Sequence, residues 1–139
     1  MNEQVTVTQS LLSDLMEGIQ HRAYAPAFGE VYLGVLRGFG QGVDHYGMVR
    51  GDLEGRVDQP LTSFAPITSE KEKRNGVMVL DKGVLPPKKG VGLVPSYVLL
   101  FWPAIRVPVR VVKDRFRKRL TLPQPFQEQA RRIIAELSA

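Results

Sequence analysis

The stretch that decides the fold is Phe64-Ala65-Pro66-Ile67-Thr68-Ser69, an apolar run that ends in two hydroxyl residues. The charged segment 70–74 follows it, so the pattern predicts a buried strand whose hydroxyls emerge at its rim. At such a rim Thr68 and Ser69 either meet a ligand or begin a turn. A second strand-like run, residues 96–101, lies downstream.

The composition is that of one ordinary globular domain. The chain has 139 residues, of which 43% are hydrophobic and 24% charged, enough for one core. Its net charge of +5 favours a polyanion, an acidic protein or an anionic surface as partner. There is no cysteine, which excludes disulfides, thiolate nucleophiles and cysteine-based zinc sites and is compatible with the cytosol.

The first 26 residues predict a helical extension. Thr8 or Ser10 can cap a helix over 8–22, in which apolar residues recur at helical spacing. The helix should end near Ala25, because a residue before proline is disfavoured in helical geometry. Its apolar face must be covered by the domain, a second subunit or a partner.

The rest of the chain predicts mostly strands and a closing helix. A glycine-rich loop is expected at 37–42, and a polar linker at 51–59. A C-terminal helix is expected over 124–137, with an apolar stripe from Phe126 to Leu137. The expected strands are 28–36, 44–50, 64–69, 76–80, 96–101 and 107–112.

Three short motifs resemble the MazF/PemK/Kid toxins. They are the Gly29-Glu30-Val31-Tyr32 opening, the Ala-Pro-Ile-Thr-Ser run at 65–69, and Ser96-Tyr97-Val98-Leu99-Leu100 with Ile105-Arg106 after it. The resemblance covers roughly residues 28–138. It implies a mainly β fold with α, a small SH3-like antiparallel β-barrel of the MazF/CcdB type that is usually a homodimer. The expected domains are the extension 1–26 and the barrel 27–139.

The resemblance also implies a chemistry. Members that cut RNA need no metal: an arginine and a threonine position the ribose 2′-hydroxyl to attack its own phosphate, leaving a 2′,3′-cyclic phosphate end. Thr68 stands where the family's threonine stands, but His45 replaces the arginine. An imidazole can serve as general base or acid, or stabilise the phosphate as imidazolium, so His45 and Thr68 are the expected catalytic pair. The alternative is an idle histidine in a site that has lost its catalyst.

Five further residues are expected to bind the substrate. In the family the glycine-rich loop helps to hold RNA, and here Arg37 suits a phosphate contact while Phe39 suits base stacking. Arg50, Ser69 and Arg106 complete the set, with the arginines contributing charge. A plain hairpin loop is the alternative for residues 37–42.

Two features leave other functions open. Phe101-Trp102 replaces the polar pair common in the family; Trp102 either stacks a base or packs a core edge or an oligomer interface. The basic run 113–119 is either a solvated segment or a polyanion-binding patch. The alternative functions are a catalytically silent barrel that works as a binding or assembly module, and a CcdB-like inhibitor of a protein target.

The remaining expectations concern partners and location. RNA is the expected substrate, and an acidic antitoxin or another protein is a possible partner. No metal and no cofactor is expected, because two histidines without cysteine offer no ligand spacing. The apolar stretch 91–112 is long enough to span a bilayer, but its arginines and prolines favour buried strands. A cytoplasmic protein without a membrane segment is therefore expected.

Overall fold

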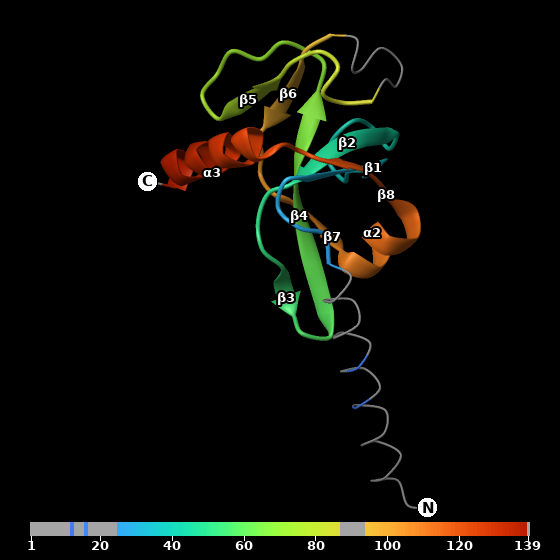
Figure 1. The fold of residues 1–139 in the computed structure, drawn as a ribbon. Coiled ribbons are helices and arrows are strands. Elements are labelled where there is room, and N and C mark those ends of the chain that lie inside the picture. The colour runs from blue at the N-terminus through green and yellow to red at the C-terminus, as the bar shows by residue number, and fades with distance from the viewer. Residues whose placement is uncertain (1–11, 13–15, 17–24, 87–93, 139) are drawn as a thin grey trace, which may run out of the picture.

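A ten-residue strand, β4 (Gln59–Thr68), runs through the centre of the computed structural model (Figure 1). The structure describes residues 12, 16, 25–86 and 94–138. β4 contains residues 64–68 of the run that was expected to form a buried strand, and nine of its ten residues are buried or half-buried. The prediction of a buried strand ending at Thr68 is confirmed.

Around β4 the described residues 25–86 and 94–138 form an antiparallel sheet and two helices. The sheet order is β5-β6-β4-β2-β1-β8, with β3 and β7 also paired to β4. The protein is therefore mainly β, with a curled half-barrel sheet. The other elements are β1 (Glu30–Val35), β2 (Asp44–Val49), β3 (Glu54–Arg56), β5 (Val77–Leu80), β6 (Ser96–Leu99), β7 (Ile105–Pro108), α2 (Val109–Arg115), β8 (Arg117–Thr121) and α3 (Gln124–Ser138).

Each edge of β4 pairs with two short strands, and the pairing is interrupted between them. On one edge β2 pairs with residues 64–66 and β3 with residues 59–61, and the chain between them, residues 50–53, forms a break. On the other edge β7 pairs with residues 61–64 and β6 with residues 67–68, and residues 100–104 form a second break. The two breaks lie on opposite edges of β4. The second break contains Trp102, which belongs to the candidate site described below.

A proline in the middle of β4 accounts for the second break. The Arg50 N–H donates to the Ser63 carbonyl, so the odd-numbered residues of β4 bond to β2. Pro66 is even-numbered, so its nitrogen, which carries no hydrogen, is directed to the opposite edge. That edge is where the β6–β7 pairing is interrupted. A proline is tolerated there because no ladder hydrogen bond is lost.

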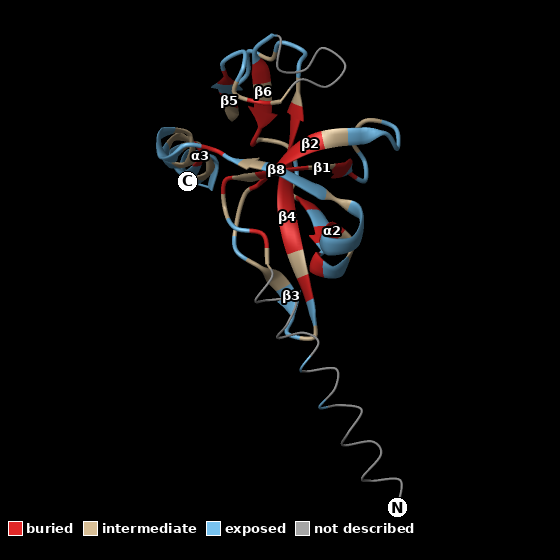
Figure 2. Ribbon diagram, turned by 45° about the vertical axis from the view of Figure 1, so that its right-hand side comes forward, coloured by how far each residue is buried: buried red, intermediate tan, exposed pale blue. Residues whose placement is uncertain are grey.

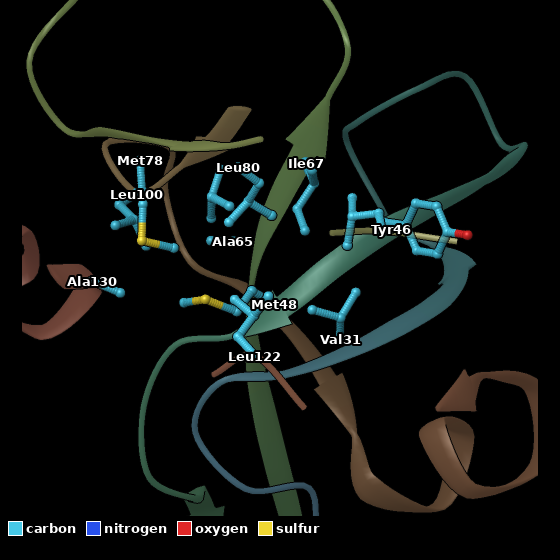
Figure 3. Packing of buried hydrophobic residues seen from close by; sticks show 12 residues of the cluster. Val31, Tyr46, Met48, Ala65, Ile67, Met78, Leu80, Leu100, Leu122 and Ala130 are labelled. Carbon is cyan, nitrogen blue, oxygen red and sulfur yellow. The ribbon is translucent and has the colours of Figure 1, made fainter. Parts of the chain in front are cut away.

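Both faces of the sheet are buried. One apolar cluster contains Val31, Met48, Ile67 and Leu100 and is covered by α3 through Ala130 (Figure 3). The other contains Tyr32, Val49 and Phe64 and is covered by α2 through Val112. The two helices lie on opposite sides of β4, and the buried residues follow β4 along its length (Figure 2).

One strand prediction was wrong in its second half. Residues 107–112 were expected to be extended, but the strand ends at Pro108 and α2 begins at Val109. The valines misled the alternation pattern: Val109 and Val112 are the buried pair, and a spacing of three is helical. A proline immediately before a helix is compatible with its start.

The other predictions along the chain have mixed outcomes. The strand over 44–50 and the helix over 124–137 are confirmed to within one residue, and the expected linker contains the short strand β3. The helix expected over 8–22 lies outside the described residues except for Leu12 and Met16, which are 59% and 52% exposed. Within the described ranges no helix is long and apolar enough to cross a membrane.

Candidate functional site

The glycine-rich loop joins β1 to β2 and folds back on itself. The Phe39 N–H donates to the Leu36 carbonyl at 3.1 Å. Gly38, Gly40 and Gly42 have φ of 83°, 77° and 81°, a region that favours glycine. A hollow is lined by residues 35–42, which include both predicted ligands of the loop, Arg37 and Phe39. The loop prediction is confirmed, and its backbone depends on glycine.

Three aromatic side chains from distant segments meet beside this loop. The Phe39 ring contacts the His45 imidazole with 5.2 Å between ring centroids, and the Trp102 indole at 5.4 Å, both in edge-to-face geometry. All three side chains are half-buried. Phe39 and Trp102 also pack against the Phe64 cluster. The glycine-rich loop, the start of β2 and the break between β6 and β7 therefore form one surface.

The loop backbone lies directly on the imidazole. His45 Nε2 is 3.4 Å from the Gly40 carbonyl oxygen, and it donates a long hydrogen bond to that oxygen in the tautomer that carries the hydrogen on Nε2. A Cβ on residue 40 would fall 1.9 Å from Nε2. Only glycine therefore allows this contact, and the imidazole is covered on that side by the loop.

Thr68 lies at the end of β4, where it makes a turn. Its Oγ1 accepts a hydrogen bond from the Glu70 N–H at 3.1 Å. This bond fixes the position of the oxygen and leaves the hydroxyl hydrogen available as a donor. Thr68 is half-buried and Ser69 is exposed. The arrangement fits a simple turn, and it equally presents a donor to a ligand.

His45 and Thr68 belong to neighbouring strands. The recorded β2–β4 register ends at the pair Gly47 and Pro66, and each predicted residue lies two positions beyond it. By strand alternation both side chains belong to the face that carries Phe64. Past this pair β4 turns to pair with β6, Thr68 being opposite Tyr97, and the β2 and β4 ends diverge (Figure 1). The two residues therefore lie on neighbouring strands, at the point where the strand ends diverge.

The Arg50 side chain forms hydrogen bonds within the fold. It lies in the β2–β3 break, and its Nη1 donates to the carbonyl oxygens of Leu100 and Trp102, at 2.9 and 3.0 Å, in the β6–β7 break. Its guanidinium thus reaches across β4 and joins the two breaks. Burial, followed by the positive charge of Arg106, lowers the pKa of Arg50. The desolvated guanidinium gains its hydrogen bonds from the protein itself.

The other two predicted arginines differ from each other. Arg106 on β7 donates through Nε to the Glu54 carboxylate, and both side chains are about half exposed. Arg37 is exposed in the glycine-rich loop. Of the three arginines, Arg37 is the one at the hollow, and it can turn toward a bound anion.

The donor set for a metal is sparse. Within the described residues no three His, Cys, Asp or Glu side chains gather closely enough to hold an ion. The predicted site residues thus fall into two groups. Arg50 and Arg106 are bound to groups of the protein. The other five lie at the loop and strand ends: Arg37, Phe39, His45, Thr68 and Ser69.

Comparison with known proteins adds no relative. No protein-family model matches the chain, and neither a curated protein nor a solved structure matches it. The toxin-family resemblance therefore rests on the motifs quoted above and on the curled antiparallel sheet.

Sequence reasoning found one feature of this site in part and missed another. Trp102 packs at a core edge, which was one of its predicted alternatives, but its contact with Phe39 was not foreseen. The reach of Arg50 to two carbonyls had no signal in the sequence, because its acceptors are backbone atoms about fifty residues away.

Proposed function

We propose that the protein binds single-stranded RNA and cuts it as a metal-independent endoribonuclease of the MazF/PemK type, with His45 and Thr68 at the reacting phosphate. The observation that supports this most is the position of these two residues on the same sheet face, at the diverging ends of β2 and β4. Arg37 and Phe39 lie on the adjacent loop. These residue types supply a proton acceptor, a hydroxyl donor, a cation and a stacking ring.

The proposed reaction is an internal transesterification. The imidazole of His45 takes the proton of the ribose 2′-hydroxyl, and the 2′-oxygen forms a bond to phosphorus. The Thr68 hydroxyl donates to a non-bridging phosphate oxygen as negative charge accumulates there, and Arg37 adds positive charge. The bond from phosphorus to the 5′-oxygen breaks, and that oxygen takes a proton from the imidazolium. The products are a 2′,3′-cyclic phosphate and a 5′-hydroxyl.

This reaction requires the glycine-rich loop to move. Phe39 and the Gly40 carbonyl cover the imidazole, so they must withdraw before a phosphate reaches His45. A loop with glycine at 38, 40 and 42 has few side chains to unpack. RNA bases that stack on Phe39 or Trp102 replace the aromatic contacts that are lost.

The test is cleavage of a mixed RNA pool in the presence of a metal chelator. Wild-type protein should produce cyclic phosphate ends, and His45→Ala and Thr68→Ala should each reduce the rate by about 10²-fold or more. Ser138→Ala is the control, because it removes an exposed hydroxyl on α3, outside the proposed site, and should keep at least half of the rate. Equal rates for Thr68→Ala and Ser138→Ala would contradict the assignment.

A second function is favoured by one observation: Arg50 and Arg106 are engaged by the protein's own carbonyls and carboxylate. Of the predicted arginines only Arg37 then remains for the reacting phosphate. A site with so little positive charge suits RNA binding or assembly without cleavage. RNA that is bound tightly but recovered at full length from the same assay would select this function over the nuclease.

A further inference from the structure

The positive charge of this protein is concentrated in one segment. Residues 110–119 hold six Lys or Arg and one acidic residue, Asp114, so this segment carries a net charge of +5. The whole chain also has a net charge of +5, and the remaining residues balance at thirteen of each sign. Any long-range attraction to a polyanion therefore originates here.

The fold places this segment on the outside of the sheet. β8 follows α2 directly in the chain, and among the described strands it pairs with β1 alone, at the edge of the sheet (Figure 1). Phe116, between them, anchors the segment: its ring stacks on Phe64 at 5.4 Å. The charged side chains are left on the exposed side (Figure 2). We call this the basic edge, defined by Arg110, Lys113, Arg115, Arg117, Lys118 and Arg119.

A register shift in β8 spreads these cations. Leu120 pairs with Val31 and Lys118 with Tyr32, so Arg119 is the extra residue of a bulge. Lys118 forms an ion pair with Glu30. Arg110, Arg115, Arg117 and Arg119 are exposed and form no ion pair with other described residues. These four guanidinium groups are therefore the ones able to reach an external anion.

The basic edge adjoins the candidate site. Arg117 pairs with Leu33, two residues before the end of β1, and the glycine-rich loop follows that end. Phe116 and Val111 pack on the same apolar cluster as Phe39 and Trp102. A strand of RNA that stacks on Phe39 can thus continue over β8.

The chemistry of the surface favours a phosphate backbone over a protein. Protein interfaces have an apolar core, but residues 105–121, all of which are described, include none of the large exposed hydrophobic side chains. Exposed arginines without apolar neighbours suit sequence-independent contacts to phosphates.

We propose that the basic edge binds the sugar–phosphate backbone of single-stranded RNA that extends from the site at the glycine-rich loop. The inference rests on the proposed function in that RNA is the ligand, but it does not require cleavage. It predicts binding that weakens steeply with salt, because each phosphate contact releases a counterion.

The test measures binding apart from catalysis. The probe is a labelled 2′-O-methyl RNA oligonucleotide, which has no free 2′-hydroxyl and cannot be cut. The test variant is Arg117→Gln with Arg119→Gln, and the matched control is Lys82→Gln with Arg132→Gln, two exposed cations outside the basic edge. The test variant should bind roughly tenfold more weakly at 0.1 M salt, and its salt slope should fall by about 0.7 per lost contact. The control should resemble wild type.

Two additions make the result unambiguous. Arg117→Lys with Arg119→Lys keeps the charge and should retain most of the affinity, which separates charge loss from misfolding. A poly-glutamate peptide tests the alternative of an acidic protein partner. Equal weakening in test and control variants, absence of RNA binding in wild type, or loss of poly-glutamate binding with RNA binding intact would each overturn the inference. Failure to cut ordinary RNA would contradict the proposed function and leave this inference standing.

Discussion

The arginines of this protein fall into two regions with opposite uses. Around β4, Arg50 is half-buried and bonded to two carbonyls, and the adjacent loop closes over His45. On the basic edge, Arg115, Arg117 and Arg119 are exposed and engaged by no carboxylate among the described residues. Charge near the centre therefore holds the fold together, while charge at the edge is available to a ligand. Substitutions in the two regions should affect different measurements.

The largest effect on stability is expected at Arg50. Arg50→Ala removes two charge-assisted hydrogen bonds and leaves the Leu100 and Trp102 carbonyls without this donor. The free energy of unfolding should fall by about 2–4 kcal/mol, measured by urea denaturation. The fold then loses the connection between the two breaks.

The control at the basic edge is Arg115→Ala, which removes an exposed arginine. Its free energy of unfolding should stay within about 0.5 kcal/mol of wild type. Equal free energies of unfolding for Arg50→Ala and Arg115→Ala would contradict the claim that the central arginine stabilises the fold and the edge arginine does not.

The loop over His45 offers a matched pair of glycines. Gly40→Ala and Gly42→Ala both place alanine at a positive φ, but a Cβ meets the imidazole only at residue 40. Each should cost about 1 kcal/mol for the backbone, and Gly40→Ala about 1–2 kcal/mol more for the displaced contact. Thermal unfolding gives the difference.

Fluorescence should locate that displacement. Trp102 is the only tryptophan and contacts Phe39, so its emission should shift in Gly40→Ala and remain unchanged in Gly42→Ala. An identical emission spectrum in both variants would mean that the loop does not press on His45.

The smallest effect concerns the ion pair between Lys118 of the basic edge and Glu30. Burial alone would raise the pKa of Glu30, but hydrogen bonds from Lys118 and the Ala27 N–H outweigh it, and the pKa is lowered from 4.5. The carboxylate therefore contributes stability above pH 4.5, and this contribution is lost as the pH falls through the lower folded-state pKa.

Glu30→Gln should consequently lower stability by about 0.5–1 kcal/mol at neutral pH and flatten the acid limb of the stability curve. Lys118→Met should flatten it in part, because the Ala27 and Tyr32 bonds to Glu30 remain. Superimposable pH profiles for wild type and Glu30→Gln would show that the pair does not contribute.

Local patterns predicted much of the sheet. The run at 64–69 identified β4, and the segments at 44–50 and 76–80 identified β2 and β5, because half-buried strands carry their alternation in the sequence. The pattern failed at Val109, where valines spaced for a helix also alternate. It also missed β3, which has no buried residue to mark it.

The candidate site was predicted only in its local parts. The glycine-rich loop and the hydroxyl at Thr68 are visible in sequence because both depend on consecutive residues. The contact of Phe39 with Trp102, and the bonds from Arg50 to Leu100, join segments more than forty residues apart. Such contacts depend on sheet pairing, which no local pattern specifies.

The chemistry at the RNA ends tests the central claim most directly. RNA treated with wild-type protein in chelator should carry 2′,3′-cyclic phosphate and 5′-hydroxyl ends by mass spectrometry, and these ends should disappear with Thr68→Ala and persist with Ser138→Ala. Intact RNA, 3′-hydroxyl ends, or a Thr68→Ala variant as active as wild type would contradict the assignment of His45 and Thr68 as a reacting pair.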